Sequence, residues 1–317
     1  MDNTILTIIV PVFNTGHVLS RCIDSIINQS LKDVDIIIVN DASTDNSNEI
    51  IERLQLRHPQ IQCINRDRNG GPGASRNDAL HVVNSKYVAF LDSDDWVDTD
   101  AYLTAVTALE DSPDCDIAIF GIKTEYNNSV LSTLRYSYNN RNVISGKFAI
   151  NLLANMYSQD IRISALLGNK IFLTELLKEN RLHFAVKYFE DTVFTYQSFI
   201  CAKNIILLPE VYYHYYQRET SIMHSFSKKY IDDLFGCFIL LEQYINSKGL
   251  MPEHKDSFFA FFERCRRSTM NTLFINEQSV VQQKEYIRYF YDKFLVAFSL
   301  ADYIQYLDIN RIKELML

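Results

Sequence analysis

The sequence lacks the features that mark secreted, membrane-spanning and nucleic-acid-binding proteins. Its first residues, Met1 to Thr4, contain neither the basic nor the apolar region of a signal peptide. The strongest apolar run, Leu234 to Leu241, is too short to cross a bilayer. A basic excess is also absent, because 39 acidic residues outweigh 31 basic ones and give a net charge of −8. We therefore expect a cytoplasmic protein that does not bind nucleic acid and that binds anionic ligands only at a local site or through a metal.

Cysteine pairs with metal-binding or redox spacing are absent as well. The six cysteines are scattered along the chain, and several lie in apolar stretches. This pattern is typical of buried free thiols in a reducing compartment. What is present is the composition of a soluble globular protein, with 47% hydrophobic and 22% charged residues. The 317 residues are enough for one large domain or two.

Strand and helix patterns alternate over the first ~120 residues, as a parallel α/β sheet requires. A β-branched run from Leu6 to Phe13 precedes helical spacing from Gly16 to Gln29, and Tyr87 to Leu91 is the fourth predicted strand. Later segments predict helices over 147–156 and 169–178, a hairpin or loop over 125–145, and strands over 205–208 and 211–216. From Lys228 onward, apolar and aromatic residues recur at helical spacing. We therefore predict an α/β domain at 1–227 and a helical region at 228–317.

Three carboxylates, Asp92, Asp94 and Asp95, follow the fourth predicted strand within four residues. Alternate residues of a strand point to the same side, so Asp92 and Asp94 can converge on one ion. Carboxylate oxygens suit Mg²⁺ or Mn²⁺, which can carry a diphosphate. The alternative is a solvated turn, in which Asp and Ser are ordinary residues. Asn14 and Asp41 also follow predicted strands, at the edge where such sheets bind ligands, and this favours the metal site.

Four motifs stand in order along the chain: Val10-Pro11-Val12-Phe13-Asn14, Val39-Asn40-Asp41-Ala42-Ser43-Thr44-Asp45, Asn69-Gly70-Gly71-Pro72-Gly73-Ala74-Ser75-Arg76-Asn77 and Phe90-Leu91-Asp92-Ser93-Asp94-Asp95. Together they resemble family 2 glycosyltransferases with the GT-A fold, bacterial enzymes that build capsule, O-antigen and other surface glycans. The resemblance covers about residues 5 to 225. It implies a Rossmann-like mixed sheet flanked by helices, a nucleotide-sugar donor with uridine as the expected nucleoside, and Mn²⁺ or Mg²⁺ at the diphosphate.

The resemblance also implies roles for single residues. Asp191 would be the general base that takes the proton of the acceptor hydroxyl, with Glu190 in support. Direct displacement with one base would invert the anomeric centre and give a β-glycoside. The predicted metal ligands are Asp94, Asp92 and His224. The predicted donor-binding residues are Pro11, Val12, Phe13, Asn14, Asp41, Arg76, Asn77, Asp92, Ser93, Lys170 and Arg218.

Several of these assignments have alternatives. Asp41 would accept the uracil N3–H or belong to a helix-entry turn, and Arg76 would face the diphosphate or ribose or be a structural ion-pair partner. Lys170 could support the acceptor side or Asp191. Acidic residues at a helix N-terminus, such as Asp191, also stabilise the macrodipole. A lone histidine such as His224 is more often structural than a ligand.

The sequence says less about the acceptor and other partners than about the donor site. The acceptor would be a glycan or a lipid-linked oligosaccharide. The aromatic residues of 228–317 could form a core, hold a second subunit, or contact the inner face of the cell membrane; a core with an oligomer contact is favoured. Two other functions compete: a non-catalytic donor-binding partner in a glycan synthase complex, and a sugar nucleotidylyltransferase. Intact Asp94 and Asp191 argue against the first, and the Pro11 to Asn14 segment replaces the Gly-rich basic motif that the second needs.

Overall fold

The computed structural model describes residues 4–127, 129–136, 141–156, 162–184, 189–217, 227–276 and 279–297. The chain divides into two compact units, Met1–Ala149 with Ser164–Arg218, and Ile150–Ile163 with Glu219–Leu317. The predicted domains 1–227 and 228–317 rest on the change to helical residue spacing after 227, and they stay a prediction. In the structure, the segment 150–163 groups with the C-terminal residues. Within the described residues, no helix is both long and apolar enough to cross a membrane.

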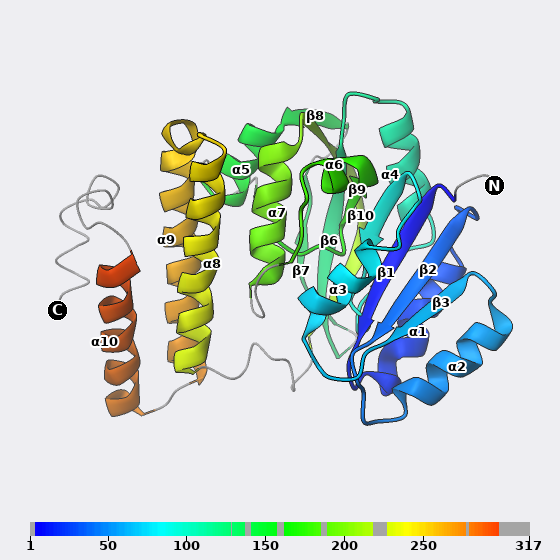
Figure 1. Ribbon diagram of the computed structural model, residues 1–317, viewed down its shortest axis with the longest axis horizontal. Coiled ribbons are helices and arrows are strands. Elements are labelled where there is room, and N and C mark those ends of the chain that lie inside the picture. Colours follow the sequence, from blue (N-terminus) through cyan, green and yellow to red (C-terminus); the bar gives the residue numbers. More distant parts are fainter. Residues whose placement is uncertain are drawn as a thin grey trace. The chain divides into compact units, whose positions relative to one another are not determined.

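A ten-stranded sheet forms the centre of the first unit, in the order β3-β2-β1-β4-β9-β6-β10-β5, with β7 beside β6 and β8 beside β10 (Figure 1). The strands are β1 Leu6–Val12, β2 Val34–Asn40, β3 Ile61–Asn65, β4 Tyr87–Phe90, β5 Trp96–Val97, β6 Ile117–Tyr126, β7 Ser129–Leu134, β8 Asn142–Ser145, β9 Lys170–Leu173 and β10 Asn204–Tyr216. The helices up to β10 are α1 Gly16–Ile27, α2 Ser47–Arg57, α3 Pro72–Leu80, α4 Ala101–Glu110, α5 Gly146–Leu153, α6 Thr174–Glu179 and α7 Glu190–Cys201.

The sheet is mixed, as the resemblance implied. Strands β3, β2, β1 and β4 are parallel, and helices connect them. Strand β9 runs antiparallel to both β4 and β6, whereas β10 runs parallel to β6. Because β1, β2 and β4 are parallel, their carboxyl ends meet at one edge of the sheet. The residues that follow these strands, Asn14, Asp41 and Asp92, therefore gather there.

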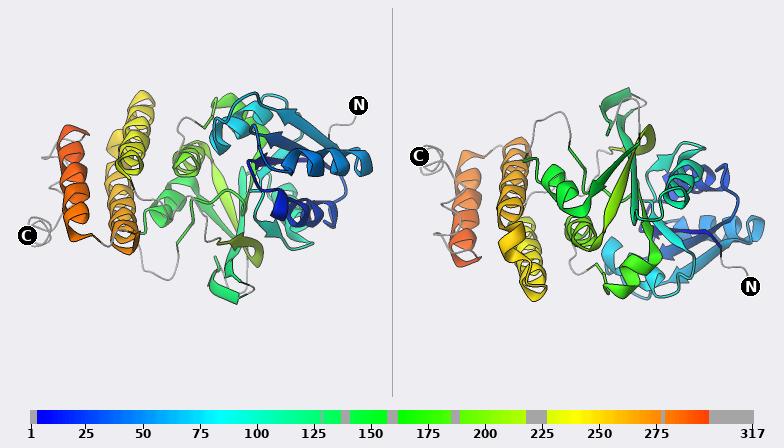
Figure 2. Two further views of the ribbon diagram at one scale, coloured as in Figure 1. Left: turned by 90° about the horizontal axis from the view of Figure 1, so that it is seen from below. Right: turned by 90° about the horizontal axis from the view of Figure 1, so that it is seen from above.

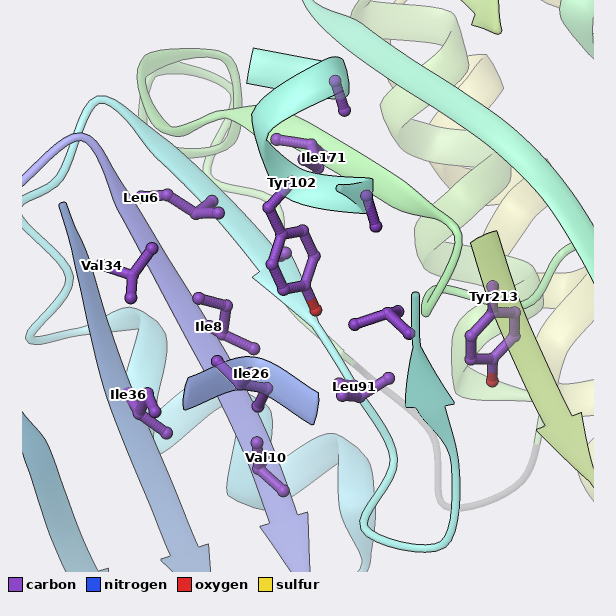
Figure 3. Packing of buried hydrophobic residues seen from close by; sticks show 14 of the residues in the cluster. Leu6, Ile8, Val10, Ile26, Val34, Ile36, Leu91, Tyr102, Ile171 and Tyr213 are labelled. Carbon is purple, nitrogen blue, oxygen red and sulfur yellow. The ribbon is translucent and has the colours of Figure 1, made fainter. Parts of the chain in front are cut away.

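Apolar side chains fill both faces of this sheet. On one face, Leu6, Ile8 and Val10 of β1 are fully buried in a core that includes Ile26 of α1 and Tyr102 of α4 (Figure 3). Continuous apolar runs of this kind are typical of parallel strands that are covered on both faces.

On the opposite face, an aromatic cluster packs against α7. Phe90 of β4 and Phe172 of β9 alternate in sequence with Ala89 and Ile171, which belong to the first core. The Phe90 ring lies 5.4 to 5.9 Å from those of Phe172, Phe184 and Phe194. This cluster holds the start of α7 near the end of β4, where the acidic motif lies.

Two predicted elements differ from the structure. The helix predicted over 169–178 is wrong, because residues 170–173 form β9 between β4 and β6, and only Thr174–Glu179 is helical. A short apolar run such as Ile171 to Leu173 fits either element, and pairing with two neighbouring strands decides it. The strands predicted over 205–208 and 211–216 are one strand, β10, whose register shifts between Leu207 and Val211. The hairpin predicted over 125–145 is confirmed where β6 pairs with β7.

The described helices of the second unit confirm the helical C-terminal region. They are α8 Lys228–Ser247, α9 Met251–Asn276 and α10 Val280–Ala297, and α8 contacts the other two (Figures 1 and 2). Phe235 and Phe238 of α8, Phe262 of α9 and Phe290 of α10 are buried and pack ring against ring. These aromatic residues form a core, as the periodicity favoured. All six cysteines are free, with Cys22, Cys115 and Cys237 buried.

Candidate active site

The acidic motif forms a turn that is fastened to β10. The Asp95 amide donates to the Asp92 carbonyl at 3.0 Å, which closes the turn. The buried Asp95 carboxylate accepts from the Tyr213 hydroxyl and, at 2.8 Å, from the Tyr216 amide. Burial raises the pKa of Asp95 well above its usual value, and the neighbouring carboxylates of Asp94 and Asp92 add to this. Asp95 therefore positions the turn. Asp92 and Asp94 are the remaining carboxylates of the turn that can face a ligand.

Arg76 of α3 joins this turn to the start of α7. Its guanidinium donates to Asp92 Oδ1 at 2.5 Å, to Asp191 Oδ1 at 2.7 Å and to Glu190 Oε1 at 3.1 Å. Burial alone would lower the pKa of Arg76, but the carboxylates, led by Asp191, outweigh it and raise the pKa. The Arg76 residue is only 1% exposed, so the geometry favours the ion-pair alternative over direct contact with a diphosphate.

The pair Glu190-Asp191 opens α7, as its motif predicted. Phe189, just before it, has a left-handed backbone (φ 60°), which turns the chain into the helix. Burial raises the pKa of Asp191 to about 8, the Arg76 guanidinium acts against this, and the nearby carboxylates of Glu190 and Asp92 reinforce it. One fifth of the Asp191 side chain is still exposed. A carboxyl group that titrates near neutral pH and is open to solvent can act as a general base.

Lys170, at the start of β9, is fully buried and close enough to Asp191 to feel its charge. Its ammonium donates to the Ser164 carbonyl at 2.8 Å, to Asn169 Oδ1 at 2.9 Å, and to the Leu166 carbonyl. Burial lowers the pKa of Lys170 to about 7, and Asp191 acts in the opposite direction. Lys170 therefore holds the segment 164–169 through these hydrogen bonds, and its burial leaves no surface for a ligand.

The predicted nucleotide side lies at the ends of β1 and β2. Asn14, with a left-handed backbone, accepts on its side-chain oxygen from the Thr44 amide at 2.8 Å and so fixes the loop after β2. The buried Asp41 accepts from the amides of Gly70 and Gly71 at 3.0 and 2.7 Å, and from Arg66. Asp41 thus secures the Gly-rich loop next to β2, and its contact with a base stays a prediction.

The other residues predicted to bind the donor differ in their exposure to solvent. Pro11 and Val12 are buried in β1, whereas Phe13 is 45% exposed beyond its end. Ser93 is buried in the acidic turn, where its Oγ accepts from Thr15 Oγ1 at 2.8 Å. Of this group, only Phe13 presents a large surface that could contact a base or sugar.

The amide of Asn77 is engaged within the protein. It donates to the Phe184 carbonyl at 2.7 Å and accepts from the Phe184 amide at 2.8 Å. The predicted contacts of Arg218 and His224 lie outside the described residues.

The residues that the structure describes are compatible with a divalent ion but do not by themselves form a complete site. Asp92 gives one oxygen to Arg76, and 34% of its side chain is exposed at the turn that also holds Asp94. Carboxylate oxygens are the ligands that Mg²⁺ and Mn²⁺ prefer, and diphosphate oxygens can complete such a site. Within the described part of the chain, no group of three or more His, Cys, Asp or Glu side chains is placed to hold a metal.

Two residues of the site were missed in the sequence. Arg66, just after β3, pairs with Asp41 and Asp78, and Tyr215 of β10 is near enough to the carboxylates of the acidic turn for them to raise its pKa. Period-two alternation in β10 places Tyr215 on the face of Tyr213, but only the tertiary structure brings that face to the turn.

The chain matches known proteins in both sequence and fold. The model for the family described as glycosyl transferase family 2 matches residues 7–166. A poly(ribitol-phosphate) beta-glucosyltransferase of Bacillus spizizenii is 29% identical over 263 residues, which are 81% of this chain and 39% of the relative. The chain thus spans about two fifths of that relative's length.

Solved structures show the same fold. TarS 1-349 of S. aureus, in complex with UDP-GlcNAc, superposes with a TM-score of 0.72 at 22% identity, over 93% of this chain and 82% of that one. The mannosyltransferase PcManGT of Pyrobaculum calidifontis, in complex with GDP-Man and Mn²⁺, gives 0.54 at 16% identity, over 95% and 77%. The first likeness confirms the predicted GT-A architecture.

Proposed function

Because the chain belongs to glycosyltransferase family 2, we propose that it transfers a sugar from a UDP-sugar to a hydroxyl group of a bacterial surface glycan, with inversion at the anomeric carbon. One observation carries this proposal. The acidic turn after β4 and the Glu190-Asp191 pair of α7 meet on the guanidinium of Arg76. A donor-side carboxylate and a candidate base are thereby held next to each other, as a direct displacement requires.

Asp191 acts as the base in this proposal. The acceptor hydroxyl must lose its proton as its oxygen attacks the anomeric carbon, and the Asp191 carboxylate takes that proton. Arg76 opposes the effect of burial and so favours the ionised form of Asp191 that catalysis needs. Asp94 and Asp92 would hold Mn²⁺ or Mg²⁺, which supplies positive charge to the leaving diphosphate.

The substrates are inferred from relatives. The poly(ribitol-phosphate) glucosyltransferase suggests a polyol-phosphate or similar wall polymer as acceptor, and the TarS complex with UDP-GlcNAc suggests UDP as the nucleotide. We propose that the protein works at the cytoplasmic side of the membrane, where nucleotide sugars are made. A lipid-linked acceptor, a membrane contact and a homo-oligomer remain predictions from the aromatic C-terminal helices.

A donor panel tests the function. The purified protein is incubated with Mn²⁺ and a set of UDP-, GDP- and dTDP-sugars, and release of free nucleotide is measured with and without chelator. We expect slow hydrolysis of one UDP-sugar, lost with chelator. Calorimetric titration with the same donors accompanies the panel. Donor binding without turnover, even with wall-polymer acceptors, would favour the non-catalytic alternative, and absence of any nucleotide-sugar binding would contradict the proposal.

A further inference from the structure

The phenol of Tyr215 lies in the candidate active site, and the proposed transfer reaction assigns it no role. Tyr213 and Tyr215 are alternate residues in a stretch of β10 with regular register, so they point to one face of the strand, whereas Tyr212 lies at the register shift between Val211 and Tyr213. The Tyr213 hydroxyl reaches Asp95 in the acidic turn, whereas the Tyr212 hydroxyl lies 3.2 Å from Thr104 of α4. Tyr215 is two residues nearer the end of β10 than Tyr213, on the face that meets the turn.

The surroundings of Tyr215 are acidic. Burial raises the pKa of Tyr215, and the carboxylates of Asp95, Asp92, Asp94 and Asp191 raise it further. The backbone shows the same proximity, because the amide of the next residue, Tyr216, donates to Asp95 in the turn at 2.8 Å. A tyrosine hydroxyl is protonated at physiological pH even at its ordinary pKa. The Tyr215 side chain is partly exposed, and within the described residues its hydroxyl makes no hydrogen bond. A neutral donor group thus stands beside carboxylates of both the acidic turn and α7.

We propose that the Tyr215 hydroxyl donates a hydrogen bond to an oxygen of the sugar that is transferred. This inference rests on the proposed function. In a direct displacement, the anomeric carbon lies between the leaving diphosphate, held at Asp92 and Asp94, and the acceptor oxygen, held at Asp191. A group with both sets of carboxylates as neighbours is therefore next to the sugar ring. A neutral phenol suits a sugar hydroxyl, since it adds no charge that would compete for the anionic diphosphate.

The first test removes only the hydroxyl. Tyr215→Phe keeps the ring, and we expect kcat/KM for the UDP-sugar that is active in the donor panel to fall about 10-fold, which is the loss of one hydrogen bond to the ligand. Binding of UDP alone, measured by calorimetry with Mn²⁺, should change less than about twofold. Tyr212→Phe is the matched control, because it removes a phenol of the same strand whose hydroxyl lies against Thr104 of α4 instead of the acidic turn, and it should alter neither quantity.

The second test identifies the oxygen and does not depend on the variant's stability alone. Deoxy analogues of the active donor are compared on the wild-type protein and on Tyr215→Phe. One analogue should lose about 10-fold on the wild-type protein and little on the variant, because the bond is already absent there. Equal losses for every analogue on both proteins would overturn the inference. A parallel fall in UDP affinity would place the hydroxyl at the nucleotide instead and would also overturn it.

The two proposals fail in different ways. If the wild-type protein turns over a UDP-sugar and Tyr215→Phe matches it within twofold, the function holds and the role of Tyr215 is wrong. If the wild-type protein binds neither UDP-GlcNAc nor UDP-glucose nor any other nucleotide sugar in the panel, the function is wrong, and the inference about Tyr215 is wrong with it.

Discussion

At the scale of single residues, one buried arginine governs the charge state of the site. Arg76 is surrounded by the carboxylates of Asp92, Glu190 and Asp191 and is almost fully excluded from solvent. A buried cation without partners would be costly, and so would buried carboxylates without a cation. The four side chains therefore form one charged cluster, and a substitution of Arg76 changes the pKa of the candidate base Asp191.

Asp191→Asn tests the base directly. The amide keeps the size of the side chain but cannot take a proton from the acceptor, so we expect kcat to fall by about 10²- to 10⁴-fold. UDP-sugar affinity, measured by calorimetry, should stay close to that of the wild-type protein. A variant that lost donor binding in proportion to activity would show that Asp191 supports the donor and is not the base.

The pH dependence of transfer follows from the pKa of Asp191, which is raised to about 8. The base works in its ionised form, so kcat/KM should rise with pH and level off above about pH 8. Arg76→Gln removes the group that lowers this pKa and should move the rise to higher pH, whereas Arg76→Lys, which keeps the charge, should move it less.

The control for this pH series is Arg57→Gln, which removes a positive charge from the exposed end of α2. Its pH profile should match that of the wild-type protein. A profile for Arg76→Gln that falls uniformly, without a shift along the pH axis, would mean that Arg76 acts only through structure.

At the scale of elements, a close contact between β10 and the segment before β9 explains why residue 168 is a glycine. A Cβ on residue 168 would lie 2.5 Å from Cζ of Tyr213, the ring whose hydroxyl binds Asp95. Gly168 thus permits β10 to approach and hold the acidic turn. The sequence alone does not reveal this contact, because the Tyr213 ring comes from a distant part of the chain.

Gly168→Ala should therefore destabilise the protein by about 1 to 3 kcal/mol, because the methyl group overpacks the Tyr213 ring. Gly236→Ala is the matched control, since a Cβ there meets nothing within 4 Å in the interior of α8. That change should be neutral or stabilise by up to about 1 kcal/mol, as alanine favours a helix. Thermal unfolding of both variants measures the difference, and equal midpoints would contradict the close-contact argument.

At the scale of the whole molecule, the second unit includes a short segment from the middle of the chain. Arg264 of α9 donates to the carbonyls of Leu153 and Ile163, which belong to that segment. Leu153 and Ile163 are themselves fully buried. The second unit is therefore built from two separate stretches of sequence. The pattern of residue types along the chain does not show that these stretches belong together.

Arg264→Ala should lower the free energy of unfolding by about 1.5 to 3 kcal/mol, because it removes charge-assisted hydrogen bonds to partly buried carbonyls. Arg267→Ala, three residues on, removes an exposed arginine whose ion pair with Glu263 lies at the surface, and should cost less than about 1 kcal/mol. Chemical denaturation followed by circular dichroism compares the two. Similar losses would show that the segment 150–163 is not held through Arg264.

The sequence by itself determined the features that are local. Strand and helix periodicity, the residues that follow β1, β2 and β4, and the order of the four motifs are set by neighbours in the chain, and they were enough to predict the mixed α/β sheet and the family. Parallel strands bring their carboxyl ends together in any such sheet, so Asn14, Asp41 and Asp92 could be placed at one edge without coordinates.

Only the tertiary structure decided what depends on contacts between distant residues. It made residues 170–173 a strand because β4 and β6 pair with them, and it made Arg76 an ion-pair partner because α3, the acidic turn and α7 converge there. It also brought the end of β10, with Tyr215, to the acidic turn, since Tyr213 and Tyr216 both donate to Asp95. Burial raises the pKa of Asp191 and lowers that of Lys170, and this burial arises from packing between segments that are far apart in the sequence.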